Sequence, residues 1–482
     1  MSSTMNREHA VVLGAGMAGL FAARVLSEQF DSVTVVERDR LPGYPTERKG
    51  VPQGRHLHNF LSRGVNVMTE LFPGILDELA TAGAVVATDG DLSRMYVRFG
   101  GSVLKRSGTL SDPGLLTLCP ATRPFLEFHV RRRVTGLPNV TFLDEHDVAE
   151  PLVDGDAVTG VRITKRNTGF ASTLAADLVV DTMGRASRTP AFLEGLGYGR
   201  PAEDRTEAKV AYSSQRLSIP KGRIAEHLVM FNPGGGQPGG LLVAGEHDTW
   251  TLAIAQLVDV GHPPTDFAAM ITIAEQALPA AIANGLRSAQ PIGEAVTYRH
   301  TSSVWRRYDQ MPTFPSGLLV MGDAVCSLDP IYGQGMTVAA LEAQTLRDCL
   351  RSGDAQLAQH FFTAAAQYIG STWASNRARD RHAFPVRTRR SVRQLAEGWF
   401  VKAVLNAAAN DVAVTERFLR ISNLIDSQAQ LQDPALLARI VAANLRALFT
   451  QTRTHAAKGL AAGNASGRLR PMPSTVVGRC SR

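Results

Sequence analysis

The stretch Ala10-Val-Val-Leu-Gly14-Ala-Gly16-Met-Ala-Gly19 decides the fold of this chain. Its first four residues form a short apolar run, which predicts a buried strand of a parallel sheet. The three glycines then open an apolar helix, and the β-branched run Val33–Val36, followed by Glu37, predicts a second strand. Strand, helix and strand in this order indicate one βαβ unit, so the predicted fold class is α/β.

The spacing of the three glycines is suited to binding a pyrophosphate. The first permits a tight turn, the second lets a pyrophosphate approach the backbone, and the third lets the helix pack on the strand. The pyrophosphate would lie at the helix N-terminus, and the Glu37 carboxylate would accept hydrogen bonds from a ribose. The candidate nucleotide-binding residues of this unit are Gly14, Ala15, Gly16, Met17, Ala18, Gly19, Glu37 and Arg38. The motif alone does not distinguish FAD from NAD.

A second glycine-rich stretch follows a short apolar run at 318–321 and reads Gly322-Asp323-Ala-Val-Cys-Ser-Leu-Asp-Pro330-Ile-Tyr-Gly333-Gln-Gly335-Met336. Together with the first motif, it resembles the FAD-dependent monooxygenases of the aromatic-hydroxylase (group A) superfamily over about residues 8–375. In that family a Gly-Asp pair binds the ribityl chain, and a Pro-x-x-Gly-Gln-Gly turn lies against the isoalloxazine. The resemblance therefore implies bound FAD, with Pro330, Gly333, Gly335 and Met336 at its ring and no particular side chain as catalytic base.

The resemblance also implies further FAD contacts from residues scattered along the chain. They are Gly322 and Asp323 at the ribityl chain, together with Arg123, Val148 and Gly184. The chain departs from the family pattern at Cys326, where a histidine is usual, and at Thr337, where an asparagine is usual. Neither position does redox chemistry in the family, so the expectation of FAD stands.

A narrower resemblance lies in the run Arg48-Lys-Gly-Val-Pro-Gln-Gly-Arg55-His-Leu-His58 and at Leu431–Pro434. These runs are similar to those of flavin epoxidases in polyether antibiotic biosynthesis, a branch of secondary metabolism. The resemblance implies that a hydroperoxide formed on the reduced flavin delivers one oxygen atom from O2 to an alkene of an apolar natural-product intermediate. Lys49 and Arg55 are candidates for contacting a cofactor phosphate, and NAD(P)H or a separate flavin reductase would supply electrons.

Other functions remain open beside epoxidation. Aromatic hydroxylation uses the same flavin intermediate, a geranylgeranyl-type reductase saturates alkenes without oxygen, and a non-enzymatic protein would hold FAD as a structural ligand. A flavin halogenase is disfavoured because the sequence has no Trp-x-Trp-x-Ile-Pro motif, and a hydrolase is disfavoured because it has no Gly-x-Ser-x-Gly elbow. The pair His56 and His58 has no spaced Cys or His partners, so we expect no metal site.

The composition is that of a globular protein. The 482 residues carry a net charge of +7, but residues 377–393 and 453–482 carry +6 each, so the remainder is acidic. Neither segment contains a nucleic-acid-binding motif, and the second is expected to be a disordered tail. We expect no membrane-spanning helix and no secretory signal. With four scattered cysteines, these features predict a cytoplasmic protein, and its oligomeric state stays open.

The order of strands and helices, together with the resemblance, predicts three structural parts and a tail. The parts are a discontinuous FAD-binding domain of the Rossmann-like GR2 type, an antiparallel-sheet substrate domain and a helical C-terminal region. We expect the FAD-binding domain to comprise residues 1–80, 115–190 and 295–375, and the substrate domain residues 81–114 and 191–294. The helical region is expected at 376–452 and the basic tail at 453–482.

Several local expectations bear on the site. Hairpins are predicted at 95–104 and within 240–255, and one strand at 174–181. Alternate residues of the second hairpin would face an apolar substrate, and the candidates are Val243, Trp250, Leu252, Ile254 and, from elsewhere, Trp305. Asp433-Pro434 predicts a helix start, followed by an apolar face made of Leu437, Ile440, Val441, Leu445, Leu448 and Phe449.

Overall fold

A five-stranded parallel sheet forms the centre of the fold in a computed structural model, which describes residues 7–207, 210–353, 356–383 and 391–447. Its strands, in spatial order, are β17 (Leu318–Val320), β9 (Leu178–Asp181), β1 (His9–Leu13), β2 (Ser32–Val36) and β5 (Val140–Leu143). Every neighbouring pair is parallel. The predicted α/β class and the βαβ unit are confirmed.

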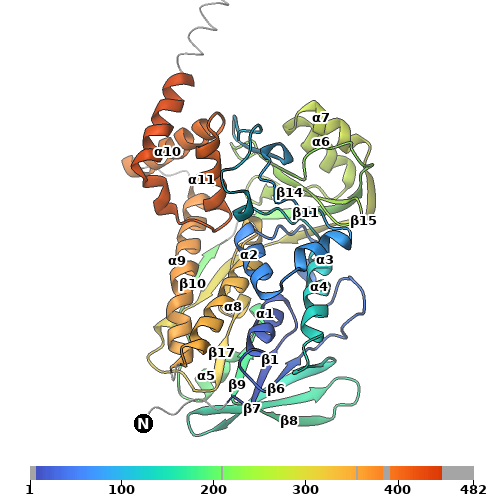
Figure 1. The fold of residues 1–482 in the computed structure, drawn as a ribbon, viewed down its shortest axis with the longest axis vertical. Helices are drawn as coiled ribbons and strands as arrows, with labels where there is room; N and C mark the ends of the chain where they lie inside the picture. The colour runs from blue at the N-terminus through green and yellow to red at the C-terminus, as the bar shows by residue number, and fades with distance from the viewer. Residues whose placement is uncertain (1–6, 208–209, 354–355, 384–390, 448–482) are drawn as a thin grey trace, which may run out of the picture.

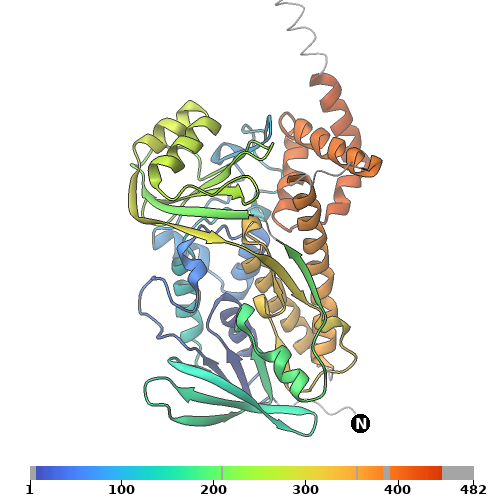
Figure 2. The ribbon, with the colours of Figure 1, turned by 180° about the vertical axis from the view of Figure 1, so that it is seen from behind.

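Helices and a second sheet cover the parallel sheet, which explains its apolar strands. Helix α1 (Met17–Leu26) packs against α8 (Gly335–Arg351), and α4 (Arg123–Thr135) lies beside α1 (Figure 1). Strand β9 also contacts an antiparallel sheet of β6 (His146–Asp154), β7 (Ala157–Lys165) and β8 (Ala171–Ala175), which crosses the base of the molecule in Figure 2. Shorter helices α2 (Ser62–Leu71), α3 (Ile75–Thr81) and α5 (Thr189–Gly195) complete this part.

A seven-stranded sheet lies above the carboxyl ends of the parallel strands (Figure 1). Its spatial order is β15 (Gln290–Arg299), β11 (Val210–Ser218), β14 (Thr249–Leu257), β13 (Gly239–Ala244), β12 (Leu228–Asn232), β3 (Met95–Phe99) and β4 (Ser102–Val103). The pairs β3–β4 and β13–β14 are antiparallel, so both predicted hairpins are confirmed. A fourth sheet, with three strands, contains β10 (Glu203–Glu207), β16 (Ser302–Arg306) and β18 (Cys326–Ser327).

The prediction of a single strand at 174–181 is wrong, because this run contributes residues to strands of two different sheets. Its first residues end β8 and its last residues form β9, and Ala176 and Asp177 stand between them. The Asp177 carboxylate accepts the backbone N–H of His9 at 2.9 Å. This polar contact anchors the chain where it passes from one sheet to the other.

The prediction that residues of the second hairpin face the substrate is also wrong. Trp250, Leu252 and Ile254 point away from the parallel sheet and form a separate core with α6 (Phe267–Ala277) and α7 (Ala280–Arg287). Val243 belongs to a third core beneath the C-terminal helices. Trp305 packs on Trp373 with ring centroids 6.0 Å apart. Alternation along a strand shows which residues share a face of the sheet. It does not show which face meets the substrate, because both faces of this sheet pack against apolar residues.

The C-terminal region is helical, as expected: its described residues form α10 (Val392–Ala408), α11 (Val412–Ser422) and a helix at 434–447, and α9 (Leu357–Ala383) precedes them. Asp433 caps the last helix, because its carboxylate accepts the N–H of Leu436 at 2.9 Å. Of the predicted apolar face, Ile440 is buried, but Val441 and Leu445 are exposed, so that prediction is wrong for these two. Leu448 and Phe449 lie outside the described residues.

We expect Phe361→Ala to destabilise the protein strongly. Phe361 lies on α9 where this helix packs against α8, and its side chain is fully buried. Truncation of a buried phenylalanine costs about 3–5 kcal/mol, so the urea midpoint of unfolding should fall clearly. Phe170→Ala is the matched control, because Phe170 is 70% exposed. Equal midpoints for the two variants would show that α9 does not stabilise the FAD-binding part.

Candidate functional site

A cavity of about 630 Å³ opens where the parallel strands end. Residues directly after β1, β2, β9 and β17 line it, as do the N-terminal ends of α1 and α8. On its other side it is lined by Tyr212, Tyr298 and His300, which come from or directly follow strands of the seven-stranded sheet. In open α/β sheets, ligands bind outside the carboxyl ends of the strands, so this cavity is the candidate site.

The turn after β1 has the geometry of an anion cradle. Gly14 adopts φ +104°, and a Cβ at Gly19 would lie 1.8 Å from the Gly14 carbonyl oxygen, so both positions require glycine. No side chain caps the N-terminus of α1. The N–H groups of its first turn are therefore available for a pyrophosphate. Gly14, Gly16, Met17 and Ala18 line the cavity, whereas Ala15 and Gly19 lie behind it.

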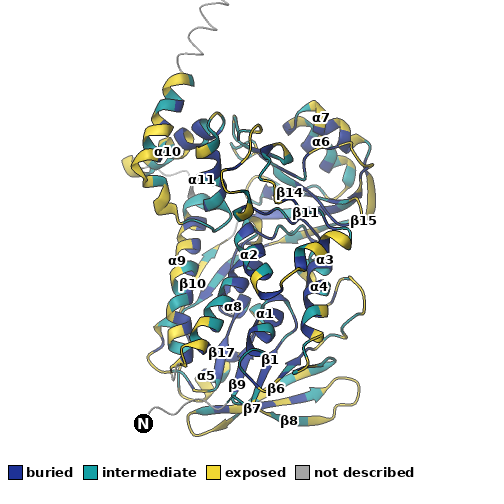
Figure 3. Ribbon diagram, viewed as in Figure 1, coloured by how far each residue is buried: buried dark blue, intermediate teal, exposed yellow. Residues whose placement is uncertain are grey.

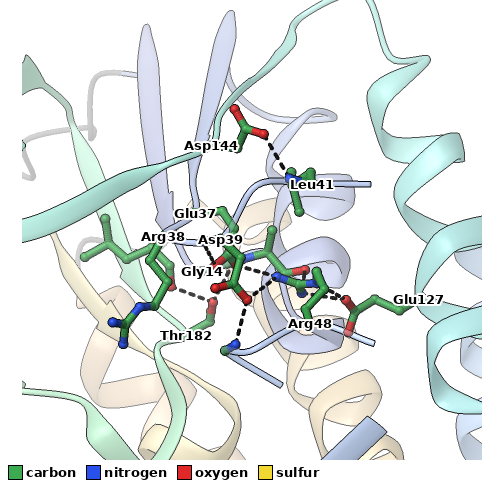
Figure 4. A network of polar contacts seen from close by, with 12 residues as sticks. Gly14, Glu37, Arg38, Asp39, Leu41, Arg48, Glu127, Asp144 and Thr182 are labelled. Carbon is green, nitrogen blue, oxygen red and sulfur yellow. Dashed lines mark hydrogen bonds and ion pairs between the residues drawn. The ribbon is translucent and has the colours of Figure 1, made fainter. Parts of the chain in front are cut away.

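A buried network of charges fixes this turn from behind (Figure 4). The Glu37 carboxylate accepts the N–H groups of Ala15 at 2.8 Å and of Asp39 at 2.9 Å. The Arg48 guanidinium donates to the Ala15 carbonyl at 3.1 Å and, through Nε, to Glu127 at 2.9 Å. Its Nη1 lies 3.2 Å from Glu37. Arg48 thus joins the glycine turn, the end of β2 and helix α4.

Charge pairing keeps the Arg48 side chain ionised although it is buried. Burial by itself lowers the pKa of a guanidinium, but the carboxylates of Glu127 and Glu37 outweigh this effect and raise the pKa of Arg48. Arg123, at the start of α4, stands 3.6 Å from Glu127 and lines the cavity. Its Nε is the atom that faces Glu127, and it makes no hydrogen bond among the described residues.

The sequence singled out the neighbours of Arg48 and missed Arg48 itself. Arg55 is exposed and pairs with Glu47 at 3.0 Å, away from the cavity. Lys49 lines a separate shallow hollow together with Arg38, which borders both spaces. The only signal for Arg48 was its place at the start of the basic run, where its burial is not visible from sequence.

The Gly322–Asp323 pair forms the opposite edge of the cavity. Gly322 adopts φ +70°, and its N–H donates to the buried Glu342 carboxylate of α8. Burial raises the pKa of Glu342 to about 8 and also raises the pKa of Asp323. The Asp323 side chain makes no hydrogen bond within the described part of the chain. A half-buried carboxyl of this kind suits the hydroxyl groups of a ribityl chain. No sequence motif pointed to Glu342.

The turn at 330–336 is held from both ends. Asp329 accepts the N–H of Ile331 at 3.0 Å, and Gly333 adopts φ +64°. Asn376 of α9 donates to Gln334 at 2.7 Å. No side chain caps α8, which begins at Gly335, slightly before the expected residue Thr337. The turn therefore presents free helical N–H groups to the cavity.

Behind the same turn, the Tyr332 hydroxyl donates to Asp380 at 2.5 Å. Helix α9 thus supports the turn at two points. Pro330, Gly333, Gly335 and Met336 line the cavity, as do Val148 and Gly184. These six positions lie together as the resemblance implies.

An aromatic cluster borders the cavity, with Tyr212 and Tyr298 at its wall and the buried His56 ring packed against both. The His56 ring lies 5.1 Å from Tyr212 and 5.5 Å from Tyr298, measured between centroids, and its Nδ1 is 3.2 Å from the Ser214 hydroxyl. Burial lowers the pKa of His56 to about 4 and that of the nearby His300 to about 4. Burial also raises the pKa of the Tyr212 phenol. These groups are uncharged at neutral pH.

His58 lies at the cavity beside Arg123 and is also neutral. Burial and the Arg123 charge lower its pKa to about 3. No group of three His, Cys, Asp or Glu suited to a metal occurs within the described ranges. Asp329, whose pKa burial raises to about 6, also lies at this wall, and the Arg185 guanidinium donates to the Tyr298 hydroxyl at 3.5 Å.

Comparison with known proteins agrees with this geometry. A family model described as an FAD binding domain matches residues 7–352. Protein Rv3254 of Mycobacterium tuberculosis is 37% identical over 461 residues, which cover 93% of this chain and 96% of that protein. Kynurenine 3-monooxygenase of Salinispora arenicola is 26% identical over 71% of this chain and 72% of its own. The structure of the flavin-dependent brominase Bmp2 superposes with a TM-score of 0.62 at 14% identity, covering 92% of this chain and 100% of that one.

We expect Arg48→Met to destabilise the protein and weaken cofactor binding together. The variant leaves Glu37 and Glu127 buried without their cation, and breaking a buried pair costs about 3–5 kcal/mol. Arg55→Met, in the same loop, removes only an exposed pair and should cost at most about 1 kcal/mol. Urea unfolding and the flavin content of the purified protein measure both effects. Similar values for the two variants would contradict the role of Arg48.

Proposed function

This chain belongs to the FAD-binding-domain family of FAD-dependent monooxygenases, and we propose that it epoxidises an alkene of an apolar natural-product intermediate. The family assignment rests on a match to residues 7–352, more than half of the chain. The choice of epoxidation goes further, and it rests on the neutral rings of Tyr212 and His300 at the cavity and of His56, which packs on Tyr212.

The residues of the cavity fit an FAD molecule. The uncapped N-terminus of α1 would take the pyrophosphate, with Arg123 beside it, and Asp323 would take the ribityl hydroxyls. The N-terminus of α8 would stabilise negative charge on the flavin ring. When it is bound and reduced, FAD supplies the electrons and the activation of dioxygen that side chains cannot supply.

The neutral aromatic rings at this wall favour an alkene as the reacting group. A phenol is commonly activated by removal of its proton, which requires a base of suitable pKa within reach. The imidazoles of His56 and His300 are weak bases, since their pKa values are about 4. An alkene needs no deprotonation before an electrophilic oxygen is added. The wall would then position an apolar substrate and exclude water, and no side chain would have to exchange a proton with it.

The proposed reaction balances with one external reductant. An alkene, one O2, two electrons and two protons give an epoxide and one water molecule. We propose that NAD(P)H, either directly or through a separate flavin reductase, supplies the electrons. The sequence contains no second nucleotide fingerprint, so direct use of NAD(P)H would not involve a Rossmann domain of its own. The similarity of the 48–58 run to polyether epoxidases favours a role in secondary metabolism.

Aromatic hydroxylation is the second candidate, and Asp329 is the observation that favours it. The negative charge of Asp329 contributes to the raised pKa of Tyr212, so the two groups lie near each other at the cavity. With a pKa of about 6, Asp329 is largely ionised at pH 7 and would accept a proton from a phenol. One relative, the Salinispora protein, is named as a monooxygenase of an aromatic compound, kynurenine.

We expect turnover of an apolar alkene under ¹⁸O2 to give an epoxide that contains one labelled oxygen atom. A labelled phenol from an aromatic substrate would assign the second candidate instead. A product that gains two hydrogens without label or oxygen uptake would assign an alkene reductase. Absence of turnover of every alkene and aromatic substrate, despite full FAD content, would favour a non-enzymatic FAD protein.

Asp329→Asn provides a matched control for this test. Asparagine keeps the Oδ1 atom that accepts the Ile331 N–H, but it cannot act as a base. Epoxidation should survive in this variant, whereas loss of a general base lowers the rate of hydroxylation about 10²- to 10⁴-fold.

A further inference from the structure

Exposed apolar side chains gather on α10 and on the last described helix. Within the described ranges, six of the thirteen exposed large apolar residues fall between positions 392 and 445: Val392, Leu395, Trp399, Val401, Val441 and Leu445. Val392, Leu395 and Trp399 follow one another at helical spacing, and Trp399 is 72% exposed. Val441 and Leu445 are exposed one turn apart on the last helix. The other exposed apolar residues are distant from one another in sequence, and isolated exposure of that kind is ordinary.

These two helices form one surface at the end of the molecule remote from the β6–β7–β8 sheet (Figure 1). They pack side by side, because Asn444 donates to the Ala403 carbonyl of α10 at 2.9 Å. Their inner faces, which include Ala403, Val404 and Ile440, are buried in a common core. The N-terminal half of α10 is largely exposed in Figure 3. We call Val392, Leu395, Trp399, Val441 and Leu445 the α10 surface.

Positive charge borders the α10 surface on both sides in the sequence. Residues 381–393, which lead into α10, contain five arginines and no acidic residue. Residues 453–482, which follow the last helix, contain six basic residues and no acidic one. The rest of the chain is acidic in sum, so the basic charge is concentrated next to these two helices in the sequence. A partner that is both apolar and anionic would match it.

We propose that the α10 surface binds the surface of an anionic phospholipid bilayer. Exposed Trp and aliphatic residues flanked by Lys and Arg are typical of segments that lie in the interface of a membrane. Trp399 and Leu395 would enter the headgroup region, and Arg393, which is 89% exposed at the same end of α10, would pair with a lipid phosphate. No helix within the described ranges is long and apolar enough to cross a bilayer, so contact would be peripheral. This proposal does not depend on the reaction that the protein catalyses.

The test uses the full-length protein with FAD and vesicles of defined composition. We expect co-sedimentation with phosphatidylcholine–phosphatidylglycerol vesicles, much less with pure phosphatidylcholine, and weakening at high salt. Brominated lipid should quench the fluorescence of Trp399, since the other three tryptophans, Trp250, Trp305 and Trp373, are buried. The double variant Leu395→Ser, Trp399→Ser should lower the vesicle affinity about tenfold or more.

Phe170→Ser is the matched control, because it removes an aromatic side chain that is 70% exposed outside the α10 surface. It should bind vesicles like the unchanged protein, and circular dichroism should show all variants folded. Equal sedimentation with and without anionic lipid, or no quenching by brominated lipid, would overturn the proposal. Self-association that the double variant abolishes, without vesicle binding, would assign the surface to a second copy. Vesicle binding that appears only after removal of residues 448–482 would show that this segment of the chain, rather than a membrane, occupies the α10 surface in the full-length protein.

Discussion

The ion pairs of Arg48 with Glu37 and Glu127 are the interactions on which the rest of the site depends. A buried guanidinium is tolerated only with anionic partners, and here each partner belongs to a different element. Glu37 follows β2 and holds the glycine turn through the Ala15 N–H, while Glu127 lies on α4, which carries Arg123 to the cavity. One cation therefore sets the relative positions of the turn, the strand end and the cavity arginine.

The parts of the fold that could be predicted from sequence are those governed by local constraints. Gly14 and Gly19 leave room that no other residue allows, and apolar runs such as 10–13 indicate buried strands. Tertiary contacts were harder to predict. Arg48, Lys49 and Arg55 look alike in one basic run, yet only Arg48 is buried. Trp250 and Leu252 were correctly placed on one strand face, but alternation could not reveal that this face packs on α6 and α7.

The two sides of the cavity differ in chemistry, in keeping with the cofactor and the substrate that each side would bind. The side built by the parallel sheet presents glycines, two helix N-termini and Arg123, which suit an anionic dinucleotide. The opposite side presents rings that are neutral because burial disfavours their charged forms. Helix α9 lies between the site and the C-terminal part. Its residues Asn376 and Asp380 support the turn at 330–336. The same helix also contacts the C-terminal part, where Gln428 donates to the Ser375 hydroxyl at 2.6 Å.

Titration of the flavin-free protein with FAD, and in parallel with FMN, tests the central claim most directly. If the Arg48-supported turn holds the adenosine diphosphate half of the cofactor, calorimetry should show one FAD per chain. FMN keeps one phosphate but lacks the adenosine monophosphate part, so it should bind about tenfold or more weakly, because it makes fewer charge-assisted hydrogen bonds at the α1 N-terminus. Failure to bind FAD, or equal affinity for FMN, would contradict the account.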